Sequence, residues 1–352
     1  MVGSGYIAWF EDIGLADREQ VGGKGASLGE LQRAGIAVPP GYVVRTAAFE
    51  RFLASLEREA PVRALVGALA AEDLAAVTAC SQALRRRIEQ SELPEEVLTE
   101  LSSAHARLLR ETPARAVAVR SSATCEDALE ASFAGLQDTY LWIKGAAQLA
   151  ERLRSCWSSL YSVESISYRL QHRLPEERVA MAVVVQHMVD ARTAGVMFTR
   201  SPTTGDRSVV TIEGAWGLGS AVVGGEVTPD RWVLGKITGE ISAREISDKS
   251  LQHAPAGEGG VRAVAVGEER RRAPCLNDEE LQQLRALARQ IERHYGRAQD
   301  IEWAVERESG TILLLQSRPE TVWSAREAAP IAKHEADPLM HLMSIFGSRQ
   351  CR

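Results

Sequence analysis

Five strand-like segments follow one another in the middle of the chain, with only turn residues between them. Val, Ile and aromatic residues recur within these segments, and Gly, Pro, Asp and Thr separate them, which is typical of β-strands joined by turns. Consecutive strands without a helix between them pair in the antiparallel sense. The sequence therefore predicts a largely antiparallel sheet from residues 181–189, 193–199, 208–216, 230–235 and 240–247.

Helical patterns lie on both sides of this region. Apolar residues recur at spacings near three and four in 46–112, which predicts three helices, the last two separated near Leu93 and Pro94. Shorter helical patterns occupy 28–35 and, in two pieces, 145–170. A last helix is expected from an N-cap at Asn277 to about residue 295.

Several short strands complete the pattern, and residues 36–44 are expected to form two of them around a Pro-Pro-Gly turn. A polar, Gly-rich stretch, 254–269, predicts a linker or mobile loop. Helices and strands mix without the regular alternation of a doubly wound sheet, so the predicted fold class is α+β with mainly antiparallel sheets and a helical insertion. The other predicted strands are 6–13, 117–120, 139–143, 300–305 and 311–318.

Composition narrows the function class. The chain has 352 residues, 45% of them hydrophobic, which suits two or three globular domains or lobes. A formal net charge of -6 argues against a nucleic-acid surface. No apolar run approaches the roughly 20 residues of a membrane span, and Glu11 and Asp12 lie where a signal peptide needs an apolar core. We therefore expect no membrane association and a cytoplasmic location.

The cysteines indicate neither a disulfide framework nor a zinc site. They are five in number, widely spaced and without a CxxC pair, so reduced thiols are expected. They are Cys80, Cys125, Cys156, Cys275 and Cys351.

Familiar catalytic and nucleotide motifs are absent or incomplete. Gly25 follows Gly23-Lys24 where a P-loop needs Ser or Thr, and neither GxGxxG nor HExxH occurs. Residues 25–29 match the GxSxG nucleophile elbow of α/β-hydrolases around Ser27. That elbow must follow a buried strand, whereas the preceding residues are polar, so the hydrolase hypothesis is the weaker alternative.

The glycine cluster and an arginine at a strand end suggest an anion site instead. Glycines in 22–25 allow backbone N–H groups to approach an anion, and Lys24 adds a mobile positive charge. Arg120 ends the strand 117–120 and is followed by Ser-Ser-Ala-Thr and a second loop, 132–139. Each feature alone also fits a solvated surface turn, but together they would hold a triphosphate.

Magnesium ligands are expected from a hairpin near the end of the chain. Alternation places Asp300 and Glu302 on one face of the strand 300–305, and Gln316 and Arg318 on one face of 311–318. A turn about Glu308-Ser309 brings Glu302 nearly opposite Gln316. Carboxylate and amide oxygens suit Mg²⁺ bridging phosphates, although a solvated polar face is the simpler alternative.

These segments, taken together, resemble the nucleotide-binding domain of the phosphoenolpyruvate synthase and pyruvate phosphate dikinase family. That domain is a divergent ATP-grasp fold that also occurs in rifampicin phosphotransferase. The resemblance extends over about residues 9–323. Its blocks are 22–44, 118–141, 183–189, 194–202, 214–230, 300–305 and 313–323, in the family's order.

The resemblance implies ATP and Mg²⁺ as cofactors and assigns roles to individual residues. Lys24, Arg120 and Arg318 would contact the phosphates, and Gly135 and Thr139 would belong to a loop that closes over them. The magnesium ligands would be Glu302 and Gln316, and the adenine hinge would be Gln186, His187 and Met188. Leu136, His187 and Gly224 are unusual for the family.

The resemblance also implies a domain division. An N-terminal lobe, 1–185, would carry the phosphate loops and a helical insertion at about 46–112. A C-terminal lobe, 186–323, would carry the adenine hinge and the magnesium ligands, and the tail 324–352 has no assigned role.

Family members cleave ATP to AMP and phosphate and pass the β-phosphoryl group to a histidine in a Thr-Ser-His block of a swivelling domain. None of the seven histidines here has that setting, so we expect the histidine, with the acceptor-binding domain, on a partner subunit. A separate ATP-binding subunit of this size resembles that of phenylphosphate synthase, which phosphorylates phenol. The alternatives are part of a split phosphoenolpyruvate synthase or antibiotic phosphotransferase, and, in another class, a regulatory nucleotide-binding subunit without turnover.

Overall fold

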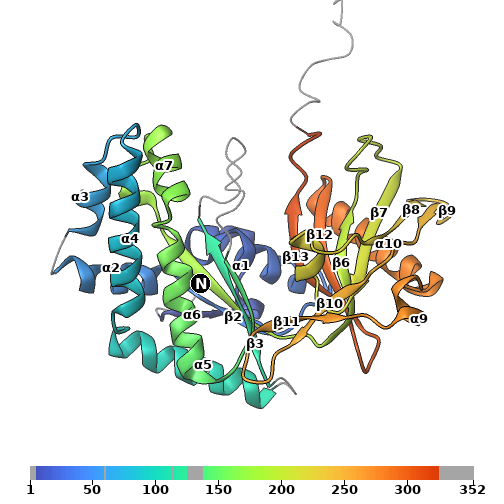
Figure 1. Ribbon diagram of the computed structural model, residues 1–352, viewed down its shortest axis with the longest axis horizontal. Coiled ribbons are helices and arrows are strands. Elements are labelled where there is room, and N and C mark those ends of the chain that lie inside the picture. The colour runs from blue at the N-terminus through green and yellow to red at the C-terminus, as the bar shows by residue number, and fades with distance from the viewer. Residues whose placement is uncertain (1–4, 59–60, 112–114, 125–137, 325–352) are drawn as a thin grey trace, which may run out of the picture. The chain divides into compact units, whose positions relative to one another are not determined.

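The computed structural model describes residues 5–58, 61–111, 115–124 and 138–324 (Figure 1). It divides into two compact units, Met1–Pro319 and Glu320–Arg352. In the described part of the second unit, the Glu320 carboxylate accepts hydrogen bonds from the backbone N–H groups of Trp323 and Ser324. The remainder of the tail, 325–352, lies outside the described residues. The division at 185/186 remains a prediction.

The first unit contains two large antiparallel sheets. One has five strands in the order β1-β2-β5-β3-β4, and the other has six in the order β13-β12-β6-β7-β8-β9. Every pairing between named strands is antiparallel, which confirms the mixed helical and antiparallel prediction. The strands of the five-stranded sheet are β1 (Ile7–Trp9), β2 (Gly41–Val44), β3 (Val117–Ala123), β4 (Thr139–Ile143) and β5 (Met181–His187).

The second sheet is built from the strands predicted in the middle of the chain and from the final hairpin. A separate two-stranded hairpin pairs β10 (Leu251–Pro255) with β11 (Val261–Ala265). The strands of the six-stranded sheet are β6 (Ala191–Phe198), β7 (Val209–Trp216), β8 (Asp230–Gly235), β9 (Ile241–Glu245), β12 (Gln299–Glu306) and β13 (Ile312–Pro319).

The helices gather mainly beside the five-stranded sheet, as Figure 1 shows, whereas α10 lies beside the six-stranded one. Asn277 accepts a hydrogen bond from the Glu280 N–H and thereby caps α10, as predicted. No helix in the described ranges has the length and apolar character that a bilayer crossing needs. The helices are α1 (Arg18–Arg33), α2 (Thr46–Glu57), α3 (Val62–Gly67), α4 (Leu74–Gln90), α5 (Glu95–Glu111), α6 (Gly145–Ser159), α7 (Val163–Gln171), α8 (Ser220–Val223), α9 (Glu268–Arg271) and α10 (Asp278–Tyr295), with short 3-10 turns at Phe10–Asp12, Leu15–Asp17 and Glu176–Arg178.

Several sequence predictions of elements were wrong. The described part of 46–112 holds four helices instead of three, because α3 adds a short helix after Pro61. Residues 36–40 form no strand, since consecutive prolines there lack the N–H groups that a ladder needs. The stretch 254–269 is mostly the β10–β11 hairpin rather than a linker, because Gly259 and Gly260, both with positive φ, form its turn.

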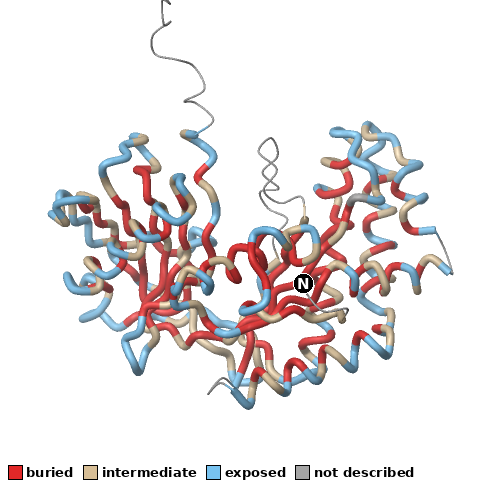
Figure 2. Tube along the Cα trace, turned by 180° about the vertical axis from the view of Figure 1, so that it is seen from behind, coloured by how far each residue is buried: buried red, intermediate tan, exposed pale blue. Residues whose placement is uncertain are grey.

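Buried residues concentrate along the strands of both sheets (Figure 2). One apolar core packs the five-stranded sheet against the helical insertion and α6, and a second packs the six-stranded sheet against α10. These cores fix the strands, so that residues at their edges and on their remaining faces are held in place.

Candidate functional site

Lys24 is positioned by a bend in helix α1. The bend lies at Gly22, whose φ of 69° is in the left-handed region. A Cβ atom at Gly22 would lie 2.0 Å from the Ser122 carbonyl oxygen, so only glycine permits this contact with β3. Lys24 Nζ then donates to the Ser121 carbonyl oxygen at 2.8 Å. The glycine cluster, predicted as a loop, is therefore helical, because the backbone needs special freedom only at Gly22.

The serines after Arg120 belong to the strand, not to a loop as predicted. Strand β3 continues to Ala123 because Ser121 and Ser122 pair with β5. Ser122 is fully buried, and its Oγ donates to the Val21 carbonyl oxygen at 2.9 Å while accepting from the Gly25 N–H at 3.2 Å. Small hydroxyl side chains fit here because the backbone of α1 lies directly against the strand.

Arg120 connects the two sheets. It is 8% exposed, and its Nη1 donates to the Leu315 carbonyl oxygen at 2.8 Å. Its Nη2 donates to Gln316 Oε1 at 2.9 Å and forms an ion pair with the Glu302 carboxylate. The arginine at the end of the predicted strand thus contacts the residues that the sequence singled out as magnesium ligands.

The predicted register of the final hairpin is confirmed. Glu302 on β12 lies opposite Gln316 on β13, and Asp300 lies opposite Arg318. A bulge follows between Glu302 and Trp303. The Arg318 guanidinium is 57% exposed and lies 3.4 Å from the Asp300 carboxylate. Two polar cross-strand pairs therefore follow each other along one edge of the six-stranded sheet.

Positive charge dominates this cluster. Burial alone would raise the pKa of Glu302, but Arg120, followed by Lys24 and Arg318, lowers it below its usual value. Three cations therefore act on a carboxylate whose side chain is 31% exposed. Such a site is suited to an anion with several negative charges.

The oxygen donors fit magnesium. Among the described residues, no group of three or more His, Cys, Asp and Glu side chains forms a complete metal site. Magnesium, however, usually takes only one or two protein carboxylates and completes its shell with phosphates and water. The Glu302 carboxylate and the Gln316 amide oxygen, which both accept from Arg120, supply donors of this kind.

A mostly buried apolar cluster lies directly beside the charged cluster. We call it the apolar seam, because its residues come from both large sheets. It reaches the charged cluster at Leu315, whose carbonyl oxygen binds Arg120. A nucleotide has charged phosphates and a largely apolar base, so a charged cluster next to an apolar cluster suits its two parts. The seam comprises buried Ala116, Ala118, Met188, Val189, Ala191, Ala194, Leu218 and Ala304, with partly buried Leu141, Trp142, Leu313 and Leu315 packed against them.

The three predicted hinge residues lie at the end of β5, and their roles remain predictions. Met188 belongs to the seam. Gln186 is 2% exposed and its amide Nε2 donates to the Pro39 carbonyl oxygen at 3.2 Å, so this side chain is engaged within the protein. His187 is half-buried, and burial lowers its pKa, opposed by the Glu306 carboxylate.

The predicted closing loop is only partly described. Thr139 begins β4 opposite Arg120 and is exposed. Gly135 and Leu136 lie outside the described residues, as does Cys125. Gly224, the other unusual position, ends the short helix α8.

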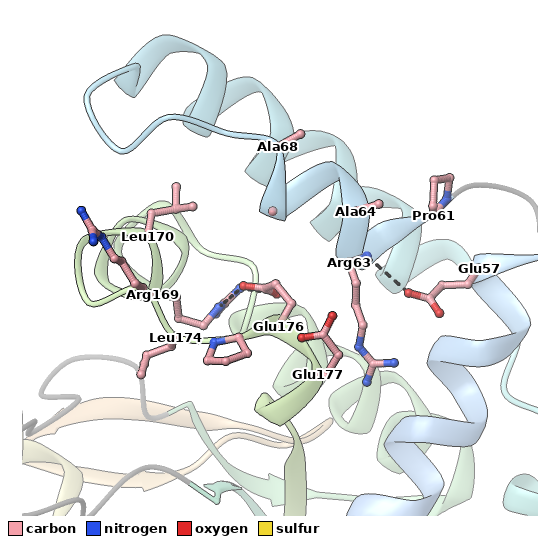
Figure 3. Close-up of a pocket in the computed structure, with 13 residues that line it drawn as sticks. Glu57, Pro61, Arg63, Ala64, Ala68, Arg169, Leu170, Leu174, Glu176 and Glu177 are labelled. Carbon is pink, nitrogen blue, oxygen red and sulfur yellow. Dashed lines mark hydrogen bonds and ion pairs between the residues drawn. The ribbon is translucent and has the colours of Figure 1, made fainter.

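A hollow of about 970 Å³ lies between α3 of the helical insertion and the end of α7 (Figure 3). Its lining includes three arginines and three glutamates, so the charges balance. Arg63 pairs with Glu50 and Arg169 with Glu176. This hollow therefore lacks the positive excess of the cluster around Arg120.

Ser27 lies inside helix α1 instead of after a strand, contrary to what a nucleophile elbow requires. Its Oγ donates to the Ser317 carbonyl oxygen at 2.7 Å, which joins α1 to β13. We expect Ser27→Ala to lower the free energy of unfolding by about 1 kcal/mol, through loss of this hydrogen bond, in urea titrations. Hydrolysis of p-nitrophenyl acetate that depends on Ser27 would contradict this structural role.

Three residues near the site make contacts that the sequence did not predict. Ser121 and Ser122 contact α1. Their position directly after Arg120 could have indicated that they lie near the site. His253 on β10 hydrogen-bonds Ser220 Oγ at 2.8 Å and Glu226 at 3.2 Å. These bonds join the β10–β11 hairpin to the glycine-rich segment between β7 and β8, and no local pattern indicates them.

The chain resembles known nucleotide-binding proteins. The family described as pyruvate phosphate dikinase, AMP/ATP-binding domain, matches residues 18–338. A probable phosphoenolpyruvate synthase of Staphylothermus marinus is 38% identical over 359 residues, covering 94% of this chain and 43% of that protein. A probable phosphoenolpyruvate synthase of Methanothermobacter thermautotrophicus is 40% identical, covering 94% and 48%. A Streptomyces rifampicin phosphotransferase is 41% identical, covering 88% and 35%. The chain thus spans less than half the length of each of these relatives.

Proposed function

The chain belongs to the pyruvate phosphate dikinase AMP/ATP-binding domain family, and from this premise we propose that it binds ATP on the cluster around Arg120. The observation that carries the proposal is the convergence of Lys24, Arg120, Glu302 and Gln316 beside the apolar seam. The phosphates would lie on the cations and the adenine on the seam. This arrangement, with its mainly antiparallel sheets, fits an ATP-grasp-type fold.

The proposed reaction is of the dikinase type. A histidine on a partner subunit attacks the β-phosphorus of ATP, the bond between the α- and β-phosphates breaks, and AMP leaves. Water then removes the γ-phosphoryl group as phosphate, so the β-phosphoryl group stays on the histidine. The protein contributes by positioning and by charge neutralisation, since Lys24, Arg120 and Arg318 oppose the charge on the phosphates. Magnesium on Glu302 and Gln316 would neutralise further phosphate charge.

The narrower proposal names phenol as the final acceptor, which rests on the resemblance to the ATP-binding subunit of phenylphosphate synthase. The relatives named phosphoenolpyruvate synthase and rifampicin phosphotransferase support a different acceptor equally well. The charged cluster and the apolar seam concern the nucleotide and not the acceptor. The acceptor is therefore to be identified through its phosphorylated product.

The test uses ATP labelled in the β-phosphoryl group. The purified chain is incubated with labelled ATP, alone and with the histidine-bearing domain of a phosphoenolpyruvate synthase. We expect AMP as the nucleotide product and acid-labile label on the added domain, because phosphohistidine is unstable in acid. Release of ADP instead of AMP would contradict the dikinase reaction. ATP binding without turnover under both conditions would favour the regulatory subunit.

A further inference from the structure

Trp142 has a backbone conformation that is unfavourable for its residue type. Its φ is 57°, in the left-handed region, where a bulky aromatic residue is rarely found. The cause is a register shift between β3 and β4. Ile143 pairs with Val117 and Tyr140 with Val119, so that Leu141 and Trp142 both lie opposite Ala118. Residues in such conformations persist only where the surrounding structure holds them, and they concentrate at ligand sites.

The β10–β11 hairpin holds Trp142 in this conformation. The Gly260 N–H donates to the Trp142 carbonyl oxygen at 3.1 Å. Beside it, Lys144 Nζ donates to the Gly257 carbonyl oxygen at 2.8 Å. The other end of the hairpin is tied to the glycine-rich segment, since the Leu218 N–H donates to the His253 carbonyl oxygen at 3.2 Å. The hairpin therefore links Trp142 to the second sheet across the seam.

The indole ring of Trp142 is partly buried against the apolar seam. Its Nε1 is shielded and makes no hydrogen bond with any residue in the described ranges. Buried donors are usually satisfied, so a shielded indole N–H suggests a partner from a ligand or water. Trp157, Trp232 and Trp303 also lack such a partner among the described residues, but they are fully buried in apolar cores. Only Trp142 of these four is partly exposed in the seam.

We propose that Trp142 is a nucleobase-contact residue, whose ring lines the base site and whose indole N–H donates to an acceptor atom on the edge of the purine. The inference rests on the proposed ATP binding and adds a residue that acts on the base alone. The charged cluster would hold the phosphates independently, because Trp142 belongs to the apolar seam, which meets the charged cluster at Leu315.

The experiment measures the dissociation constants of ATP, adenosine and tripolyphosphate by calorimetry on the full chain. Trp142→Asn is the main variant, because Asn tolerates the left-handed conformation and the backbone is therefore preserved. We expect ATP and adenosine to bind about 10- to 100-fold more weakly, which is the range for losing an aromatic contact with a base. Tripolyphosphate, which has no base, should bind as in the wild type.

Two further variants sharpen the result. Trp142→Phe keeps a ring but loses the N–H, so its loss of affinity should be smaller than that of Trp142→Asn. Trp9→Phe is the matched control, because Trp9 is a partly buried aromatic residue on β1 of the same sheet, packed against Tyr42. It should leave all three dissociation constants unchanged.

Melting temperatures separate a lost contact from a damaged fold. Trp142→Asn relieves the strained conformation but loses the packing of the ring against the seam, so these two effects oppose each other and a melting temperature near that of the wild type is expected. An unchanged dissociation constant for ATP in this variant would overturn the inference while leaving the proposed function intact. An equal loss for tripolyphosphate would also overturn it. A wild-type chain that binds neither ATP nor tripolyphosphate would overturn the proposed function and this inference with it.

Discussion

Arg120→Ala is expected to weaken ATP binding by about 10- to 100-fold, the equivalent of losing charge-assisted hydrogen bonds to a phosphate. The same side chain bonds Leu315, Gln316 and Glu302, so its removal also weakens the contact between β3 and the β12–β13 hairpin. Calorimetric titration with ATP measures the first effect and urea denaturation the second. An ATP affinity within threefold of the wild type would exclude Arg120 as a phosphate contact.

The pH dependence of stability gives this prediction a second signature. The pKa of Glu302 is lowered, so the ionised carboxylate adds stability that is present above the ordinary pKa of glutamate, about 4.3, and is lost as the pH falls through the folded value. Without Arg120, the largest influence that lowers this pKa is lost, so the pKa should rise and the stabilising contribution of the ionised Glu302 should shrink. Urea titrations between pH 4 and pH 7 measure this change as the difference in the free energy of unfolding between Arg120→Ala and the wild type.

Arg318→Ala is the matched control for Arg120→Ala. Arg318 belongs to the same cluster but is 57% exposed and lies 3.4 Å from the Asp300 carboxylate. We expect a loss of ATP affinity with little change in the free energy of unfolding, because an exposed ion pair contributes at most about 1 kcal/mol. Arg120→Lys keeps the charge but loses the fork of donors, so its affinity should lie between wild type and Arg120→Ala.

The parts of the site that depend on local periodicity were predictable. Alternation along β12 and β13, with a turn about Glu308, sufficed to place Glu302 opposite Gln316. The cap at Asn277 likewise marked the start of α10. In both cases neighbouring residues in the sequence determine the geometry, so the amino-acid pattern contains the information.

The parts that depend on packing between distant segments were not predictable. Ser121 and Ser122 have the composition of a loop, yet they form a strand because β5 pairs with them and α1 lies against them. In the β10–β11 hairpin, β10 is half-buried throughout and β11 is mostly exposed, so neither strand shows the alternation of buried and exposed residues by which strands are recognised. Trp142 has a positive φ only because the hairpin and a bulge hold it. Tertiary contacts override local preference at each of these positions.

The largest loss of stability is expected from Asp230→Asn, at the end of the glycine-rich segment between β7 and β8. Asp230 and Lys249 are both 0% exposed and form an ion pair at 2.5 Å. The Asp230 carboxylate also accepts the N–H groups of Ser247 and Cys275, each at 2.9 Å. Asn at 230 would keep one oxygen, so it could accept from only one of these two N–H groups, and it would leave the Lys249 ammonium buried without a counter-charge. Removing one partner of a buried pair costs about 3–5 kcal/mol.

Two variants test whether the lost charge, and not a general disturbance, causes this effect in urea denaturation. Asp230→Asn/Lys249→Met removes both charges and should be more stable than Asp230→Asn alone, because no buried ion then lacks a partner. Arg231→Gln disrupts the adjacent exposed pair with Glu245 and should cost less than about 1 kcal/mol. If the double variant has no higher free energy of unfolding than Asp230→Asn, packing around Asp230, and not its charge, stabilises the start of β8.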